Sequence, residues 1–356
     1  MLYWMLVFVP IPILLKFIAP QQDLLIFLAA SLAIVPLAGW LGRATEQLAE
    51  RSGEGVGGLL NATFGNATEL IIAISALRAG LHDVVKASLI GSIVGNILLV
   101  LGAAMLAGGL RHKEQQFNAL AARSQATLLT MATIALVLAA AYNAVVAPRA
   151  PEGLQRLSLY IAVVLLLVYG LFLVYSLITH KNLFAGDPHV ASDGQQSPLW
   201  SKSKALLVLT VATLLIAWVS EILVAAIEPS AHQLGLSNLF VGVFIVAILG
   251  NAAEHSSAVS AAMKNRMDLS LSIAIGSSVQ VALFVAPVLV LVSYAIGSAP
   301  MDLAFSGGLV LSVLLAVLIT GQVAGDGRSD WLKGVQLLAV YLILGLAYFF
   351  TPDVLA

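Results

Sequence analysis

Long apolar stretches recur along the whole chain, and they constrain the fold more than any other feature. Each is about 20 residues long, the length that an α-helix needs to cross some 30 Å of hydrocarbon. Of 356 residues, 60% are hydrophobic and 10% are charged, whereas a soluble domain carries roughly a quarter charged residues. Because an open strand cannot satisfy its backbone hydrogen bonds in lipid, the sequence predicts an all-α polytopic membrane protein.

Polar breaks between the apolar stretches divide the chain into about eleven predicted helices. The first is interrupted by Pro10 and Pro12. It has no positively charged segment before it and no small-residue cleavage site after it, so we interpret it as a retained helix. The predicted spans are residues 2–19, 23–49, 57–79, 84–108, 118–147, 155–179, 203–228, 237–263, 268–297, 301–323 and 332–351.

Basic residues are unevenly distributed between the two sides of this topology. With the N-terminus in the cytoplasm, twelve of the 17 Lys and Arg residues fall inside and five outside, as the positive-inside rule requires. A net charge of −1 without a basic patch argues against nucleic acid as a partner. The chain has no Cys and only six His, so we expect no thiolate or imidazole-rich metal site and no cofactor.

The second half of the chain repeats the first after 185 residues. Gly65-Asn66-Ala67 recurs as Gly250-Asn251-Ala252, and Glu69 recurs as Glu254. An odd number of helices, five, separates equivalent helices, so the repeats are inverted. Inverted repeats are typical of secondary transporters, whose substrate site lies near the bilayer midplane. The same register continues through Asp83 and Asp268, Gly91 and Gly276, and Ser92 and Ser277.

The repeat defines the expected domains. We expect an N-terminal transmembrane helix over residues 1–20, a first repeat over 21–180, a cytoplasmic linker over 181–202 and a second repeat over 203–356. The linker is rich in Gly, Pro, Asp, Ser and Gln rather than aliphatic residues.

Glu69 and Glu254 are predicted well inside their spans, where a charged side chain costs several kcal/mol and usually has a task. Asn66 and Asn251 each precede a glutamate by three residues and so share its helix face. Two carboxylates with neutral oxygens are the ligands that Ca2+ prefers. Two carboxylates close together in a low dielectric also take up protons, so Ca2+ and H+ would compete for them.

Other polar and small residues could support this site. Serine and amide side chains of the following helices can face the same centre, and glycines before each acidic motif let backbones approach or unwind. His255 is more readily a packed or orienting residue than a ligand. The supporting residues are Ser92, Asn96, Ser277, Gln280 and His255, and the glycines are Gly65 and Gly250.

Three further acidic residues are less constrained. Glu46 and Glu228 lie near opposite ends of equivalent spans, where they could be cavity mouths or ordinary solvated helix ends. Glu221, deeper in the seventh span, is a candidate proton-path residue.

Several alternatives remain open at this point. A buried Glu bonded to Asn could serve only to hold helices together. A serine hydrolase could use Ser277 or Ser278 with His255, although no nucleophile elbow is present. A cation channel could use the same acidic residues, but it would not couple two fluxes. We therefore expect a transporter rather than an enzyme.

At these motifs the sequence resembles the Ca2+/H+ antiporter (cation/proton exchanger) family of the Ca2+:cation antiporter superfamily. The resemblance is carried by residues 65–70 and 250–255, followed by 91–92 and 276–280. Related Na+/Ca2+ exchangers differ, because their repeats carry a proline before the acidic residue where this chain has Thr68 and Ala253.

The resemblance implies Ca2+/H+ exchange by alternating access, with the second and seventh spans moving. It implies Ca2+ coordination by the two glutamates, supported by Asn66, Asn251, Ser92, Asn96 and Gln280. A Na+-coupled exchanger, or one for Mn2+ or another divalent cation, is the alternative. Many members carry an acidic linker, and its absence here argues against a Ca2+-sensing role for the linker. The chain also lacks the long N-terminal regulatory tail of plant members, so it is expected in a prokaryotic plasma (inner) membrane.

Overall fold

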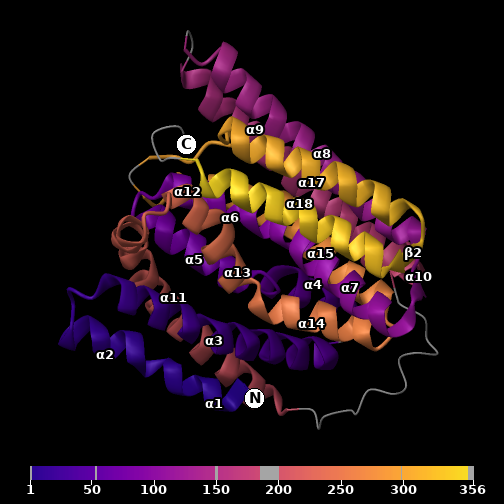
Figure 1. Cartoon of the computed structure of the whole chain (residues 1–356), viewed down its shortest axis with the longest axis horizontal. Helices are drawn as coiled ribbons and strands as arrows, with labels where there is room; N and C mark the ends of the chain where they lie inside the picture. The colour runs from indigo at the N-terminus through magenta and orange to yellow at the C-terminus, as the bar shows by residue number, and fades with distance from the viewer. Residues whose placement is uncertain (1, 53, 149–150, 185–199, 298, 352–356) are drawn as a thin grey trace. The chain divides into compact units, whose positions relative to one another are not determined.

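A computed structural model describes residues 2–52, 54–148, 151–184, 200–297 and 299–351 (Figure 1). Most of these residues lie in helices, and one sheet of two short strands connects helices outside the apolar spans. The prediction of an all-α polytopic membrane protein is confirmed. The predicted linker falls largely outside the described residues, which include the short helix α10 (Lys181–Phe184) at its start and residues 200–202 at its end.

Nine helices within the described ranges are long and apolar enough to cross a membrane, and a tenth crossing is counted if the helices on either side of Asn251 form one span. The prediction of eleven is not confirmed. The N-terminal segment forms α1 (Leu2–Met5), η1 (Leu6–Phe8) and α2 (Pro10–Ile18), and its apolar helix Leu6–Ile18 is shorter than a standard span.

The longer helices follow the predicted spans closely. Short π-helices interrupt several of them and share the label η with the 3-10 helix η1. In chain order, the long helices and their interruptions are α3 (Asp23–Ser52), α4 (Glu54–Phe64), α5 (Ala67–Arg78), α6 (His82–Val94), η2 (Gly95–Val100), α7 (Leu101–His112), α8 (Ala119–Val145), α9 (Pro151–Val174), η3 (Tyr175–Thr179), α11 (Lys202–Leu234), α12 (Asn238–Phe240), η5 (Val241–Val246), α13 (Ala247–Gly250), α14 (Ala252–Met263), α15 (Met267–Gln280), η6 (Val281–Val285), α16 (Ala286–Ser293), α17 (Gly307–Gly325) and α18 (Trp331–Phe349).

The helices pack into two compact units, each drawn from both halves of the sequence. Of the described residues, the first unit contains those between 2 and 88, those between 200 and 253 and Thr351, and the second contains those between 89 and 184 and between 254 and 350. These units are groups of contacting helices rather than sequence repeats. The division into repeats at 21–180 and 203–356 therefore stays a prediction.

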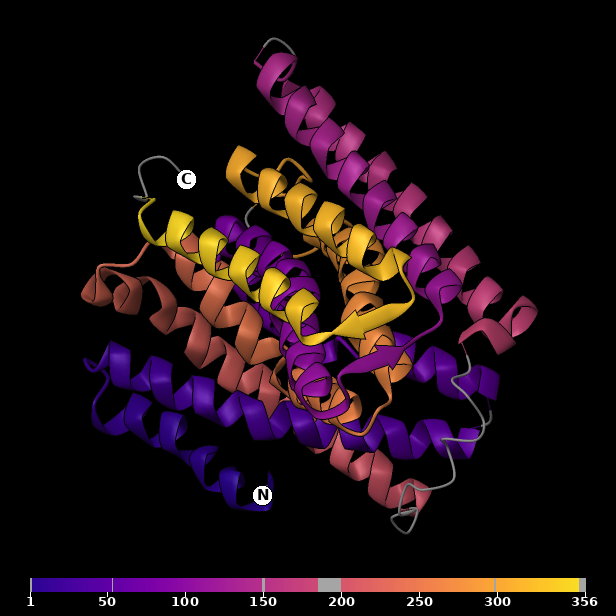
Figure 2. The same ribbon diagram turned by 45° about the vertical axis from the view of Figure 1, so that its right-hand side comes forward.

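In the first unit α3 and α11 lie side by side along much of their length (Figures 1 and 2). Ile34, Leu37 and Leu41 of α3 and Ile216 of α11 are almost completely buried. Lipid is as apolar as these side chains, so close packing rather than exclusion from water holds such helices together. The helix α11 also packs on α5, and α2 packs on α3.

An aromatic contact ties the start of α11 to α3. The rings of Trp40 and Trp200 stack with centroids 5.7 Å apart, and the Trp200 backbone N–H donates to Gln47 Oε1 over 2.7 Å. The Ser201 hydroxyl caps α11 by accepting from the Lys204 N–H, and the Lys204 ammonium lies 4.8 Å from the Trp200 ring centroid. The entry of the chain into α11 is thus held to α3 by stacking and a hydrogen bond.

In the second unit α7 packs on α18, α8 on α17, and α9 on α16. Gly102 of α7 and Gly334 of α18 let two backbones meet, because a Cβ at Gly334 would contact the Gly102 carbonyl and Leu106 nitrogen below van der Waals distance. Figure 2 shows the long α8 and α9 running together.

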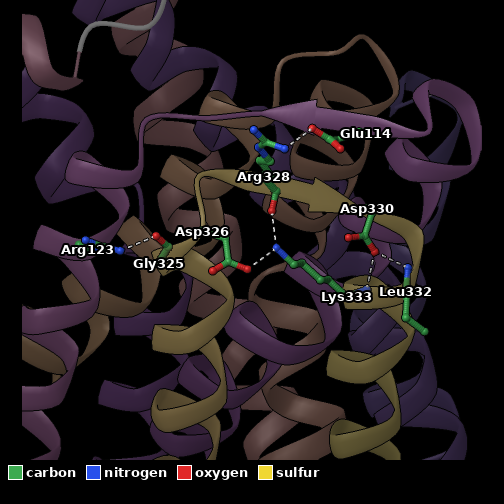
Figure 3. Close-up of polar contacts among 8 residues, drawn as sticks. All are labelled: Glu114, Arg123, Gly325, Asp326, Arg328, Asp330, Leu332 and Lys333. Carbon is green, nitrogen blue, oxygen red and sulfur yellow. Dashed lines mark hydrogen bonds and ion pairs between the residues drawn. The ribbon is translucent and has the colours of Figure 1, made fainter.

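Two strands join the ends of these helices, a feature that the sequence analysis did not anticipate. Strand β1 (Glu114–Gln116) pairs antiparallel with β2 (Arg328–Asp330). The Glu114 carboxylate lies 3.5 Å from the Arg328 guanidinium, and Asp330 caps α18 by accepting from Leu332 and Lys333 N–H groups (Figure 3).

Lys333 organises the turn before β2. Its ammonium donates to Asp326 Oδ2 and to the Arg328 carbonyl oxygen, each over 2.8 Å (Figure 3). The hydrogen bond from Lys333 and its charge hold the pKa of the Asp326 carboxyl below its usual value. Arg123 of α8 donates to the Gly325 carbonyl at the end of α17, which links α8 to the same turn.

The predicted start of the tenth span at residue 301 is wrong, because α17 begins at Gly307. Residues 301–305 are irregular, yet Met301, Leu303 and Phe305 are buried. Side chains satisfy their backbone: the Met301 N–H donates to Ser293 Oγ and the Leu303 N–H to Ser158 Oγ. The segment is apolar because it is buried in protein, and the hydropathy pattern cannot distinguish that from a helix in lipid.

Candidate cation-binding site

Both acidic motifs begin at a break in a helix. Asn66 separates α4 from α5 with φ −99° and ψ 20°, and Asn251 separates α13 from α14 with φ −101° and ψ 7°. Both side chains are buried. The two asparagines, 185 residues apart in sequence, therefore share one non-helical conformation. Unwound backbone at membrane depth is tolerated where it lines protein or a polar cavity, which is how transporters build ion sites.

Within the first unit the break at Asn251 lies against Glu69. The Asn251 amide Nδ2 donates to Glu69 Oε1 over 2.5 Å and to the Ala247 carbonyl over 3.0 Å. A Cβ added at Gly250 would lie 3.0 Å from Glu69 Cγ, so this glycine leaves the space that the glutamate occupies. Residues from both sequence halves thus meet at one half-buried carboxylate.

Asn66 and Gly65 lie in the same unit, just before Glu69. Asn66 is buried at the start of α5, and the Gly65 N–H donates to the Asn61 carbonyl at the end of α4. Glu69 is therefore in the first turn of α5, where the helix dipole favours a negative charge.

In the second unit the supporting residues of both halves also meet. The Asn96 amide donates to Ser277 Oγ over 3.1 Å, and both side chains are buried, as is Ser92. Gln280 ends α15 and is half-buried. Asn96 lies in η2 and Gln280 immediately precedes η6, so each half carries a π-helix at nearly the same repeat position. Such insertions are frequent at functional sites.

Sequence reasoning overlooked Gln125 in α8. It is buried, and its Nε2 would lie 3.5 Å from a Cβ at Gly276, the residue before Ser277. Gln125 lies in the mostly polar run of residues 123–127 at the start of α8, so no contrast with its neighbours distinguishes it in the sequence.

Glu254 and His255 lie in the first turn of α14 in the second unit, and both are half-buried. Glu69 belongs to the first unit, so the meeting of the two glutamates stays a prediction. Among the described residues no three His, Cys, Asp or Glu side chains are grouped as a metal site would group them. A cation bound by two carboxylates would need neutral oxygens to complete its coordination.

The hydrolase alternative loses one of its candidate nucleophiles. Ser278 is fully buried, and its hydroxyl donates to the Ala274 carbonyl over 3.0 Å and approaches the Ile93 carbonyl at 3.4 Å. Ser277 receives the Asn96 hydrogen bond described above.

The three other acidic residues singled out in the sequence lie on α3 and α11, the two long helices of the first unit. Glu46 near the end of α3 and Glu228 near the end of α11 are exposed, and their role as cavity mouths stays a prediction. The expectation that Glu221 is buried is wrong. Its carboxylate is 57% exposed and lies 3.4 Å from the Arg78 guanidinium, so its charge is balanced by an ion pair.

Comparison with known proteins gives a consistent result. The family model for the sodium/calcium exchanger protein matches residues 23–178 and 204–350. The Ca(2+)/H(+) antiporter of Aphanothece halophytica is 46% identical over 99% of this chain and 97% of its own length. The Ca(2+)/H(+) antiporter ChaA of Bacillus subtilis strain 168 is 42% identical, covering 91% and 92%. The solved structure of native YfkE superimposes with a TM-score of 0.84 at 37% identity, covering 99% of this chain and all of that one.

Proposed function

Because this chain belongs to the sodium/calcium exchanger protein family, we propose that it exchanges Ca2+ for H+ across a prokaryotic plasma membrane by alternating access. Relatives that match it over nearly their whole length are named Ca(2+)/H(+) antiporters, which supports these two ions as the substrates. Glu69 and Glu254 are the proposed shared ligands of the cation and the protons.

The observation that carries the proposal is the contact between Asn251 and Glu69 at a broken helix. A carboxylate held at membrane depth needs a compensating group, and the neutral Asn251 amide supplies one here. An amide offers a donor when the carboxylate lacks a metal, and an acceptor oxygen when a metal arrives. Asn251 can therefore remain a partner of Glu69 whether or not a metal is bound.

Chemical competition then couples the two ions. Ca2+ takes six to eight oxygen ligands with flexible geometry, which two carboxylates, amide oxygens and carbonyls of unwound backbone would supply. When Ca2+ leaves, two carboxylates in a low dielectric repel each other and bind protons instead. Asn66, Ser92, Asn96, Ser277 and Gln280 are the proposed additional oxygen donors or proton carriers, with His255 beside them and Gly65 and Gly250 allowing close backbone approach.

Reconstituted vesicles test the proposal. A pH gradient imposed across proteoliposomes should drive uptake of radioactive Ca2+, and Glu69→Gln or Glu254→Gln should abolish it. Glu152→Gln is the matched control, because Glu152 is exposed and pairs only loosely with Arg156 at 3.7 Å. Full transport by either site variant would reject the assignment of the site.

The same vesicles separate the alternatives. Replacing the pH gradient by a Na+ gradient would drive uptake only in a Na+-coupled exchanger, and competition by Mn2+ would reveal a broader divalent specificity. Ca2+ flux that does not move protons against their gradient would indicate a channel, because a pore cannot couple two fluxes.

A further inference from the structure

A groove of about 620 Å³ runs along one face of α14 in the second unit. The residues of α14 that line the groove are spaced four positions apart, so they lie on one face of the helix. The groove extends from His255 near the start of α14 to Lys264 just past its end, and Arg111 at the end of α7 also lines it.

Two positive charges stand at one end of this groove. Arg111 and Lys264 are both exposed. Neither side chain makes a hydrogen bond or an ion pair with any residue in the described part of the chain. Their charge is therefore not balanced by a carboxylate of those residues.

Basic residues at helix ends often serve to satisfy free carbonyl groups, but here other groups do so. The Gln115 amide donates to the Ala262 carbonyl over 2.9 Å, and His112 Nε2 lies 2.9 Å from the Met263 carbonyl oxygen. Asn265 has a φ of 59° and lets the Arg266 N–H reach the Ala261 carbonyl. The end of α14 is capped without help from Arg111 or Lys264.

The walls of the groove between these charges and His255 are partly apolar and partly polar. Val259 and Met263 present apolar surface, and Ser256 and Ser260 present hydroxyl groups. Such a groove fits a ligand that combines an anionic oxygen group with an apolar body. A free inorganic anion would leave the apolar walls uncovered, whereas a phospholipid would cover them with its glycerol and acyl groups.

The position of the groove favours the same ligand. Both helix ends belong to the side predicted to face the cytoplasm, where basic residues meet anionic headgroups and each Lys or Arg near the surface contributes about 1 kcal/mol. We propose that this groove binds an anionic phospholipid, with its phosphate between Arg111 and Lys264 and its apolar part against Val259 and Met263. The inference does not depend on Ca2+/H+ exchange, because binding needs no ion gradient.

Thermal unfolding of the full-length protein in an uncharged detergent tests the site. Added phosphatidylglycerol should raise the unfolding temperature, because a ligand bound to the folded state stabilises it. Phosphatidylcholine and millimolar inorganic phosphate should have much smaller effects. In Arg111→Gln with Lys264→Gln the apparent affinity for phosphatidylglycerol should fall about tenfold or more.

Two further variants keep the result decisive. Lys113→Gln with Lys202→Gln removes two exposed charges from the same predicted side but not from the groove, and it should bind as the parent protein does. The double variant Arg111→Lys with Lys264→Arg keeps both positive charges and should retain phosphatidylglycerol binding. It therefore separates loss of charge from loss of stability if Arg111→Gln with Lys264→Gln unfolds at a lower temperature without lipid. Equal phosphatidylglycerol stabilisation of the glutamine pair and the parent, or equal protection by inorganic phosphate, would overturn the proposal.

Discussion

Gly250 and Asn251 are neighbours in sequence, but they act on Glu69 in different ways. Asn251 donates a hydrogen bond to the carboxylate, whereas Gly250 contributes only the absence of a side chain beside Glu69 Cγ. The two requirements are independent, because one concerns charge and the other concerns volume. A motif that combines them at a helix break fixes the position of the Glu69 carboxylate.

Gly250→Ala tests the volume requirement. The added Cβ would lie 3.0 Å from Glu69 Cγ, so the glutamate must shift by a few tenths of an ångström. Overpacking of this kind costs about 1 kcal/mol or more, which corresponds to about a fivefold rise in the Ca2+ concentration that half-saturates transport. Gly170→Ala in α9 is the control, since no atom lies within 4 Å of its added Cβ. An unchanged half-saturating Ca2+ concentration in Gly250→Ala would mean that the space beside Glu69 accommodates the added Cβ without a shift.

At the scale of helices, the two halves repeat their irregularities as well as their motifs. The break at Asn66 is matched at Asn251, and the π-helix η2 is matched by η6. Irregular backbone costs hydrogen bonds in lipid, so its presence at equivalent positions of both halves supports our proposal that these positions form the cation site. The regular helices around these points are held by close backbone contacts such as that between α7 and α18.

The α7–α18 contact should depend on the absence of a side chain at Gly334. A Cβ there would meet backbone atoms of Gly102 and Leu106, which cannot rotate away. We expect Gly334→Ala to destabilise the protein by about 1–3 kcal/mol, measured by thermal unfolding in detergent. Gly321→Ala in α17 has nothing within 4 Å of its added Cβ and should be neutral. A similar unfolding temperature for both variants would contradict this packing.

The turn between α17 and β2 should respond to pH through Asp326. Lys333 holds the pKa of this carboxyl below its usual value of 3.8. A group with a lowered folded-state pKa stabilises the fold above its unfolded pKa, and the stabilisation is lost as the pH falls through the folded value. The parent protein should therefore exceed Asp326→Asn in unfolding temperature at neutral pH, and the difference should shrink below about pH 4. A difference that persists in acid would show that the Asp326 charge is not its cause.

Hydropathy and the repeat predicted most of the helices and the positions of the polar motifs, because both follow from local sequence. They did not predict the irregular segment at 301–305, whose backbone is satisfied by Ser158 and Ser293 from distant positions. They also missed the β1–β2 pair, since three-residue strands carry almost no periodic signal. They also did not predict the ion pair of Glu221 with Arg78, a partner 143 residues away that no local pattern reveals.

For the molecule as a whole, orientation in the membrane follows from charge rather than from packing. The positive-inside rule places Lys113 and Lys202 in the cytoplasm and Arg156 outside. The chain has no cysteine, so a single introduced thiol reports its own side without background. In intact cells a membrane-impermeant maleimide should label Arg156→Cys, whereas Lys113→Cys and Lys202→Cys should react only after the cells are opened. The reverse pattern would invert the predicted topology.

The N-terminal helix requires its own test, because Leu6–Ile18 is shorter than a standard span. If it crosses the membrane, as the sequence predicts, the exposed Trp4 position lies at the cytoplasmic end of its span, on the same side of the membrane as Lys113. Trp4→Cys should then be protected in intact cells, as Lys113→Cys is, and react after lysis. A short crossing is physically acceptable, since thinning of the bilayer around it costs fractions of a kcal/mol per ångström of mismatch. Labelling of Trp4→Cys in intact cells, with Lys113→Cys still protected, would show that this helix lies along the outer surface and that only the later helices cross.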